Sequence, residues 1–169
     1  MGSLKDIKPE DQTEEMCLEA VMENGLELEH VDPRFLTTEV ITEAVKQDAL
    51  SLYYVPKDLR TEDLYDFACM GNGYVLKYLY KDEDEKKKIT EYMCLAACSS
   101  NAFALSFVPM ELLNKEMILR AYEENYLATD RTVEYQDLSS YLDNPTEEDK
   151  NRMEKAEKDY DEKKKEQEK

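Results

Sequence analysis

The sequence is poor in the side chains that build metal sites and nucleophilic enzymes. It contains one histidine, His30, four cysteines and only four glycines. Cys94 and Cys98 lie one helical turn apart, but a structural zinc site usually takes two further ligands. Cys17 and His30 could form a nucleophile–base pair, yet no third partner and no glycine-rich loop accompanies them. We therefore expect no enzymatic activity, no metal ion and no cofactor, and we interpret the cysteines as small core residues.

Basic residues are also scarce relative to acids. The chain has 22 lysines and arginines against 40 aspartates and glutamates, which gives a net charge of −18 and a pI near 4.4. Residues 1–146 carry a net charge of −16, so the acidity belongs to the body of the chain. This charge disfavours direct binding to nucleic acid or to an anionic membrane, and it suits a protein partner with a basic surface.

Long apolar runs are rare, and no basic segment followed by an apolar run opens the sequence. The longest stretch without a charge, from Tyr92 to Met110, approaches the length of a membrane helix. Ser99, Ser100 and Asn101 interrupt it in the middle, and Pro109 interrupts it near the end. We therefore predict no membrane span and no secretory signal. Together with cysteines that are expected to be reduced, these absences indicate a cytoplasmic protein.

The positive signal is an internal repeat of 24 residues, with five residues inserted before the fourth copy. The copies begin at Thr13, Thr37, Thr61, Thr90 and Asn114. The eighth residue of every copy is alanine, namely Ala20, Ala44, Ala68, Ala97 and Ala121. The twelfth is asparagine or aspartate, and the thirteenth is glycine or alanine in the first four copies. A fixed period of this length is typical of stacked units that cannot bury their apolar faces alone.

Each copy predicts a helix, a turn and a second short helix. The first residue is a favourable N-cap, acids follow in the first turn, and apolar residues at positions 4, 5, 8 and 9 form one helical stripe. The Asn-Gly or Asp-Ala pair should end this helix in a left-handed C-cap. The second element has apolar residues at positions 14, 16 and 19, and a proline breaks it in three copies. Its spacing also allows a strand, as at 74–76, but we favour a stack of short helices.

These patterns predict an all-α fold, a solenoid-like stack of about five helix-turn-helix repeats followed by a charged C-terminal helix. Residues 1–12 are expected to form a mobile N-terminal lead-in, and residues 13–129 the repeat domain. Residues 130–143 lose the pattern and should cap the stack, and residues 144–169 should form the charged helix. The charged insertion at 81–88 is expected to be a solvated connector.

Two surfaces are candidates for binding a partner. The first is acidic and comprises Glu15, Glu19, Glu23 and Glu27 of the first repeat with Asp82, Glu83, Asp84 and Glu85 of the insertion. The second is uncharged, because the fourth repeat replaces three glutamates of the first by neutral residues. It comprises Tyr92, Ala96 and Ser100, with Ser99 beside them. This outer face of the fourth repeat is either covered by residues 130–169 or contacts a partner or a second copy of the chain.

The pattern A-V-x-x-[ND]-G-x-x-L-x-x-V-P is seen around Leu18–Pro33 and Thr42–Pro56. It resembles a helical repeat of unknown function that occurs in tandem arrays in bacterial and intracellular-pathogen proteins. The resemblance covers roughly residues 13–128; it is weaker in the third copy, which lacks the Val-Pro turn, and in the fifth. It implies helical stacking and a bacterial or phage origin, and it implies no catalytic residues.

We hypothesise a non-enzymatic protein-binding module. In its first form, the acidic surface mimics nucleic acid and inhibits a bacterial protein, such as a defence nuclease, by occupying its basic nucleic-acid-binding groove. In its second form, a scaffold or effector module binds through the uncharged face of the fourth repeat. A cysteine-dependent enzyme using Cys17 or Cys94 is a third and less favoured alternative, and it requires a reactive thiol in the native protein.

Overall fold

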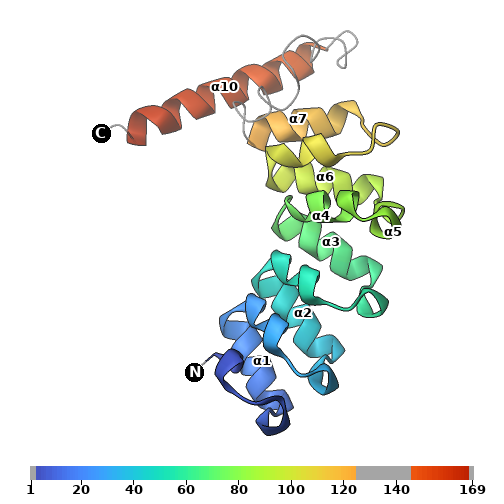
Figure 1. The fold of residues 1–169 in the computed structure, drawn as a ribbon. Coiled ribbons are helices and arrows are strands. Elements are labelled where there is room, and N and C mark those ends of the chain that lie inside the picture. The colour runs from blue at the N-terminus through green and yellow to red at the C-terminus, as the bar shows by residue number, and fades with distance from the viewer. Residues whose placement is uncertain (1–2, 125–145, 168–169) are drawn as a thin grey trace.

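The computed structural model describes residues 3–124 and 146–167, and every regular element in these residues is helical (Figure 1). The all-α prediction is therefore confirmed for this part of the chain. The first helices of the repeats are α1 (Glu14–Glu23), α2 (Thr38–Gln47), α3 (Glu62–Gly71), α6 (Glu91–Ser100) and α7 (Lys115–Glu124). The second elements are the 3₁₀ helices η3 (Gly25–His30), η5 (Ala49–Tyr54) and η7 (Ala102–Phe107), and the α-helix α4 (Val75–Lys81).

The first helices follow one another along the stack in chain order (Figure 1). α1 packs on α2, α2 on α3, α3 on α6 and α6 on α7. The alanine at position 8 is at most 3% exposed in every repeat, and the rest of the predicted stripe is buried beside it, as Val40, Ile41 and Val45 are in α2. Small side chains at this position allow neighbouring helices to approach closely, so the core is shared between repeats.

Each first helix begins where its N-cap was predicted. The side-chain oxygen of the cap residue accepts a hydrogen bond from the backbone N–H three residues further on, at 3.1–3.4 Å in all five repeats. This bond satisfies one of the N–H groups that lack a partner at a helix start, and it contributes about 1 kcal/mol. The five predicted helix starts are confirmed.

The junction between the two elements of a repeat differs from the prediction. The asparagine or aspartate at position 12 has a φ between −142° and −156° in the first four repeats, which is extended backbone. At Asn24, the N–H donates to the carbonyl of Ala20 and closes α1, while Oδ1 accepts from the N–H of Leu26 and opens η3. The predicted left-handed cap is wrong, because a side-chain acceptor makes this turn instead of a positive φ.

The small residue at position 13 is required by contact with the next repeat. A Cβ on Gly25 would lie 2.3 Å from the carbonyl oxygen of Ala44, and a Cβ on Gly73 would lie 2.4 Å from that of Ala97. The N–H of Gly25 also donates to Oε1 of Gln47 at 2.6 Å. The backbone of one repeat therefore touches the first helix of the next one directly, and only a small residue fits between them.

The second elements are helical in the first four repeats, so the prediction of short helices is confirmed there over the alternative of a strand. They are 3₁₀ helices in repeats one, two and four, and each of these is closed by a valine, at Val31, Val55 and Val108. Repeat three lacks the Val-Pro turn, and its second element is instead an α-helix that runs to Lys81. The second element of repeat five lies outside the described residues.

Residues 3–12 do not form the mobile lead-in that we predicted. Leu4 is buried, and the short helices η1 (Leu4–Asp6) and η2 (Pro9–Asp11) match η3 and η4 (Pro33–Phe35) of the first repeat. Glu27 fixes this segment, because its carboxylate accepts hydrogen bonds from Oγ of Ser3 at 2.9 Å and from the N–H of Leu4 at 2.8 Å. The sequence contains the signal, since Leu4, Ile7 and Pro9 stand 24 residues before Leu28, Val31 and Pro33.

The charged C-terminal helix is α10 (Glu147–Gln167), which packs on α7 and extends beyond the stack (Figure 1). Arg152 joins the two helices through ion pairs with Glu116 at 3.0 Å and Glu123 at 2.6 Å. Lys115 pairs with Asp149, and this hydrogen bond lowers the pKa of the Asp149 carboxyl to about 2. The cap predicted at 130–143 lies outside the described residues.

The uncharged run from Tyr92 to Met110 is divided between α6 and η7, with Asn101 as the junction. Its apolar residues are those of an ordinary repeat, and Met93, Cys94 and Leu105 are buried in the shared core. Among the helices that the structure describes, none is long and apolar enough to cross a membrane.

Candidate functional site

The outer face of the stack is formed by positions 3, 7 and 10 of the first helices, which share one side of each helix opposite the buried stripe. These positions hold Glu15, Glu19 and Met22 in repeat one, Glu39, Glu43 and Lys46 in repeat two, Asp63, Phe67 and Met70 in repeat three, Tyr92, Ala96 and Ser99 in repeat four, and Glu116, Arg120 and Glu123 in repeat five. Along the stack, the outer face therefore changes from mainly acidic to mainly apolar, and then to mixed charge.

An apolar patch occupies the middle of the outer face and consists of Phe67, Met70, Tyr92, Ala96 and Ser99. The three large side chains are about half exposed, at 47%, 53% and 54% in that order. The Tyr92 hydroxyl donates to the sulfur of Met70 at 3.5 Å, which joins α3 to α6 across the patch. Beside it lies a depression of about 380 Å³, lined by Met70, Tyr92, Leu95, Ala96, Ser99, Ser100 and Arg120.

The four uncharged residues that the sequence singled out in repeat four all line this depression. Sequence reasoning missed Phe67 and Met70, which extend the patch onto repeat three. A signal exists for Phe67, because it replaces Glu19 and Glu43 at position 7. The sequence leaves open whether the C-terminal segment, residues 130–169, covers this face. Its described residues, 146–167, pack on α7, and residues 125–145 lie outside the described part.

The predicted acidic residues of repeat one divide into two groups. Glu15, Glu19 and Glu23 are exposed on α1. Glu27 is half-buried, and its carboxylate accepts hydrogen bonds from the N-terminal segment, so its prediction as a partner-binding residue is wrong. Between α1 and α2 lies an acidic cleft of about 520 Å³, lined by Thr13, Glu14, Glu15, Leu18, Glu39 and Val40.

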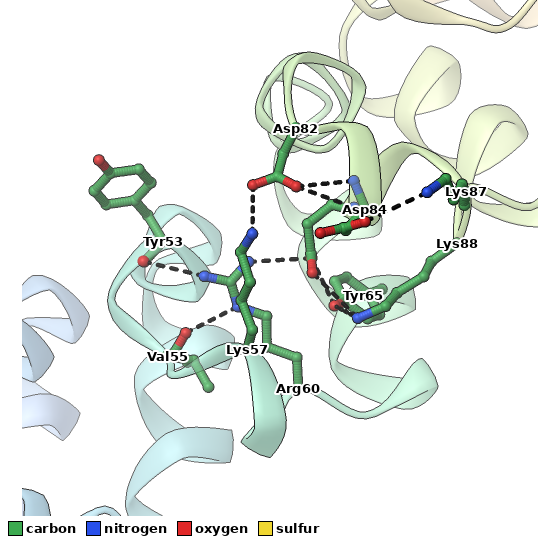
Figure 2. Close-up of polar contacts among 10 residues, drawn as sticks. Tyr53, Val55, Lys57, Arg60, Tyr65, Asp82, Asp84, Lys87 and Lys88 are labelled. Atoms are coloured by element: carbon green, nitrogen blue, oxygen red, sulfur yellow. Dashed lines mark hydrogen bonds and ion pairs between the residues drawn. The ribbon is translucent and has the colours of Figure 1, made fainter.

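The insertion is not a solvated connector throughout, because it forms α5 (Glu83–Lys86) and buries Glu85 to 2% exposure. Oε2 of Glu85 accepts hydrogen bonds from the guanidinium of Arg60 at 3.1 Å and from the hydroxyl of Tyr65 at 2.6 Å. Its Oε1 accepts from the amine of Lys88 at 3.1 Å. Figure 2 shows these donors converging, Arg60 from repeat two, Tyr65 from repeat three and Lys88 from the insertion itself. A carboxylate with three donors has little capacity left for a partner, so we assign Glu85 to the core.

Arg60 connects the end of repeat two to this buried carboxylate. Its guanidinium also donates to the carbonyls of Val55 at 2.9 Å and Tyr53 at 3.3 Å (Figure 2). Burial by itself would raise the pKa of the Glu85 carboxyl, but the hydrogen bonds from Tyr65 and Lys88 and the charge of Arg60 outweigh it, and the pKa is lowered. Glu85 is therefore a charged residue whose partners hold the insertion against the stack.

The other acids of the insertion are closer to solvent. Asp82 accepts from Lys57 at 2.5 Å and caps α5, and these hydrogen bonds lower its pKa to about 2. Asp84 pairs with Lys87 at 3.4 Å on the surface (Figure 2), and Glu83 is exposed. A groove of about 400 Å³ lies nearby, lined by Ala49, Leu50, Leu52, Tyr53, Lys57, Arg60, Val75, Tyr78, Leu79, Lys81, Asp82 and Glu85. Most of its charges are paired with each other, so the groove offers little to select a ligand.

The cysteines are core residues, and all four are free and fully buried. Burial raises the pKa of Cys69, Cys94 and Cys98 to about 12. The thiol of Cys17 donates to Oε1 of Gln12 at 3.5 Å, and burial raises its pKa as well. Within the described ranges, no three His, Cys, Asp or Glu side chains come together in a way that could hold a metal ion.

We expect the native protein to resist alkylation of its cysteines by iodoacetamide at pH 8. At a pKa of about 12 the thiolate fraction of Cys94 is roughly a thousandfold smaller than at the ordinary value of 9.0, and the sulfur is also inaccessible. Intact-mass spectrometry should show four modified sites in denaturant and slow, incomplete modification without it. Rapid modification of Cys17 or Cys94 alone in the native protein would support the cysteine-enzyme alternative instead.

Comparison with known proteins is informative for the first two repeats. Residues 13–60 match the model of a family described as Domain of unknown function (DUF4116). The matched segment begins at the first predicted repeat boundary and ends at the last residue of the second copy. No curated protein and no solved structure matches the chain.

Proposed function

We propose that this chain is a non-enzymatic helical-repeat module that binds a protein partner through its outer face. The apolar patch carries the proposal: Phe67, Met70 and Tyr92 are each about half exposed beside a depression of about 380 Å³. Apolar side chains gathered in one patch mark interaction surfaces, whereas scattered ones do not. Repeats one, two and five hold mainly charged residues at the equivalent positions, so the patch is particular to repeats three and four.

The acidic end of the outer face, which is formed by α1 and α2, favours a second candidate function. Glu15 and Glu19 are exposed on α1, and Glu39 is exposed on α2. In this form the acidic end occupies a basic groove that otherwise holds nucleic acid, for example in a bacterial defence nuclease, and acts as an inhibitor. Such binding weakens steeply as salt rises, because exposed charges are screened within about 10 Å at 0.1 M salt. Binding at the apolar patch resists salt.

Capture of partners by variants separates the two functions. The bait proteins are the wild type, the double variant Ala96→Glu/Ser100→Glu and the double variant Glu15→Gln/Glu19→Gln. A nuclease-treated bacterial lysate is the first source, because the repeat resembles one found in bacterial proteins. We expect a protein that the wild type and the glutamine variant retain at high salt and that the glutamate variant retains about tenfold less, since interface charges without a partner disfavour binding.

The other outcomes are equally decisive. A protein that elutes at moderate salt and is lost only from the glutamine variant would support the inhibitor function. Identical retention by all three baits would overturn the proposal. Light scattering of the wild type and the glutamate variant tests self-association: a dimer that the glutamate variant dissociates would make the partner a second copy of the chain.

A further inference from the structure

The outer face has a direction, because its chemistry changes along the stack. On α1 and α2 the exposed carboxylates of Glu15, Glu19 and Glu39 have no ion-pair partner among the residues that the structure describes. The apolar patch follows on α3 and α6. Beyond it, Arg120 is paired with Glu116 at 2.8 Å, so that end contributes little net charge. A partner element that fits the whole face must therefore be basic at one end and apolar further along.

Resting on the proposed function, we propose that the element bound by the outer face is a basic amphipathic helix of the partner, lying across α1, α2, α3 and α6. The backbone groups of these helices are bonded within the helices, so the face offers no strand edge to pair with, and recognition depends on side chains alone. Its apolar residues pack over the apolar patch and the depression beside Tyr92 and Ala96. Its lysines and arginines reach the acidic cleft lined by Glu14, Glu15 and Glu39.

The dimensions of the stack agree with a helix of ordinary length. Packed helices lie about 8–10 Å apart, so three steps from α1 to α6 span about 25–30 Å. At about 1.5 Å per residue, a helix of roughly 20 residues covers that distance. Charge complementarity selects a basic helix over an acidic one, because carboxylates without partners at the acidic end would repel an acidic segment.

Three fluorescent peptides of about 20 residues test the inference by anisotropy. The first is an amphipathic leucine–lysine helix, the second is the same helix with glutamate in place of lysine, and the third has the first composition in scrambled order. We expect the first to bind at least about tenfold more tightly than the other two. Ala96→Glu should weaken binding of the first peptide about tenfold. Ser99 is exposed at the same depression, so Ser99→Glu provides a second variant. Both substitutions make the protein more acidic, so a purely electrostatic attraction would instead become stronger.

The acidic end is tested with matched charge removals. The variant Glu15→Gln/Glu19→Gln/Glu39→Gln removes three charges from the outer face. The control Glu10→Gln/Asp58→Asn/Glu111→Gln removes three from exposed residues of the connecting segments, at position 22 of repeats two and four and at the equivalent place 24 residues before Arg34. We expect about tenfold weaker binding of the basic helix by the first variant and little change with the control.

Each remaining outcome overturns the inference in a recognisable way. Equal binding of the scrambled peptide, or tighter binding by Ala96→Glu, would reduce the attraction to net charge. The acidic helix could also bind as tightly as the basic one or more tightly, and be weakened equally by Ala96→Glu. That result would contradict a basic partner helix, and it would leave the apolar patch as the binding surface. Failure of every peptide to bind would reject a helical partner, and the capture experiment would still decide the proposed function separately.

Discussion

Replacing Gly73 by alanine is expected to destabilise the protein by about 3 kcal/mol, the upper end of what overpacking a closed contact usually costs. The added Cβ would lie 2.4 Å from the carbonyl oxygen of Ala97 and 2.8 Å from Cβ of Asn101. Neither atom can rotate away, so repeats three and four must separate locally. Urea unfolding followed by circular dichroism measures the change as a lower midpoint, and an unchanged slope shows that the same unit unfolds.

Gly71→Ala is the matched control, because Gly71 is exposed at the end of α3 and its nearest new contact would be Cβ of Ala49 at 3.1 Å. Alanine also favours a helix over glycine by roughly 0.5–1 kcal/mol, so the net change should be small. Ala49 and Ala102 stand at the position of Gly73 in repeats two and four, which shows that such a junction can accommodate a methyl group. Unchanged stability of Gly73→Ala would mean that the contact between repeats three and four can also widen to accommodate a methyl group.

The helices were predictable because their determinants lie within a single repeat. Thr37 caps α2 through a bond to a residue three positions away, and the apolar stripe of α2 needs only the period of a helix. The conformation of Asn24 was not predictable in the same way. Asparagine suits both a left-handed cap and a side-chain cap, and the choice depends on how Gly25 fits against Ala44 of the next repeat.

Burial of single charged residues was beyond local reasoning. In the sequence, Glu85 is one acid in a run of charges, and nothing nearby distinguishes it from Glu83 or Asp84. Its burial is decided by Arg60 and Tyr65, which stand 25 and 20 residues earlier in the chain. A periodic comparison of whole repeats also passes over segments shorter than one copy, and for that reason it predicts a lead-in at residues 1–12 and not a partial repeat.

The outer face was predictable where repeat columns could be compared directly. Tyr92 and Ala96 stood out because the first repeat has glutamate at both positions. Met70 did not, since Met22 fills the same position in repeat one. Only the packing of α3 on α6, across the inserted residues, brings Met70 to the Tyr92 hydroxyl and makes one patch of two repeats.

Replacing Glu85 by alanine is expected to destabilise the protein by about 3–5 kcal/mol, because it leaves a largely buried guanidinium without its carboxylate. The side chain of Arg60 is 12% exposed and that of Glu85 is 2% exposed, so water replaces the lost contact poorly. Tyr65 also loses the acceptor of its hydroxyl. Urea unfolding of the wild type and the variant gives the difference in free energy.

A double-mutant cycle separates the ion pair from simple loss of packing. The variants are Arg60→Met, Glu85→Leu and the combination of the two. Each single substitution leaves one buried charge without its partner. The double substitution replaces both charged side chains by apolar groups of similar size, so the double variant should be more stable than either single variant. Strictly additive losses would mean that Arg60 and Glu85 contribute independently and that their contact does not hold the insertion in place.

Acid titration tests whether the negative charge of Glu85 stabilises the protein, with Glu85→Gln as the variant. The pKa of Glu85 is lowered in the folded protein, so as the pH falls the unfolded chain takes up this proton first. The stability contributed by the charge is therefore present above the pKa of an unfolded glutamate and is lost as the pH falls through the folded-state pKa. Asp82 and Asp149 titrate in both proteins and cancel in the comparison. The difference in unfolding free energy between the wild type and Glu85→Gln should become smaller as the pH falls. A difference that stays constant to the lowest pH at which both proteins fold would show that the hydrogen bonds of Glu85 stabilise the protein and its charge does not.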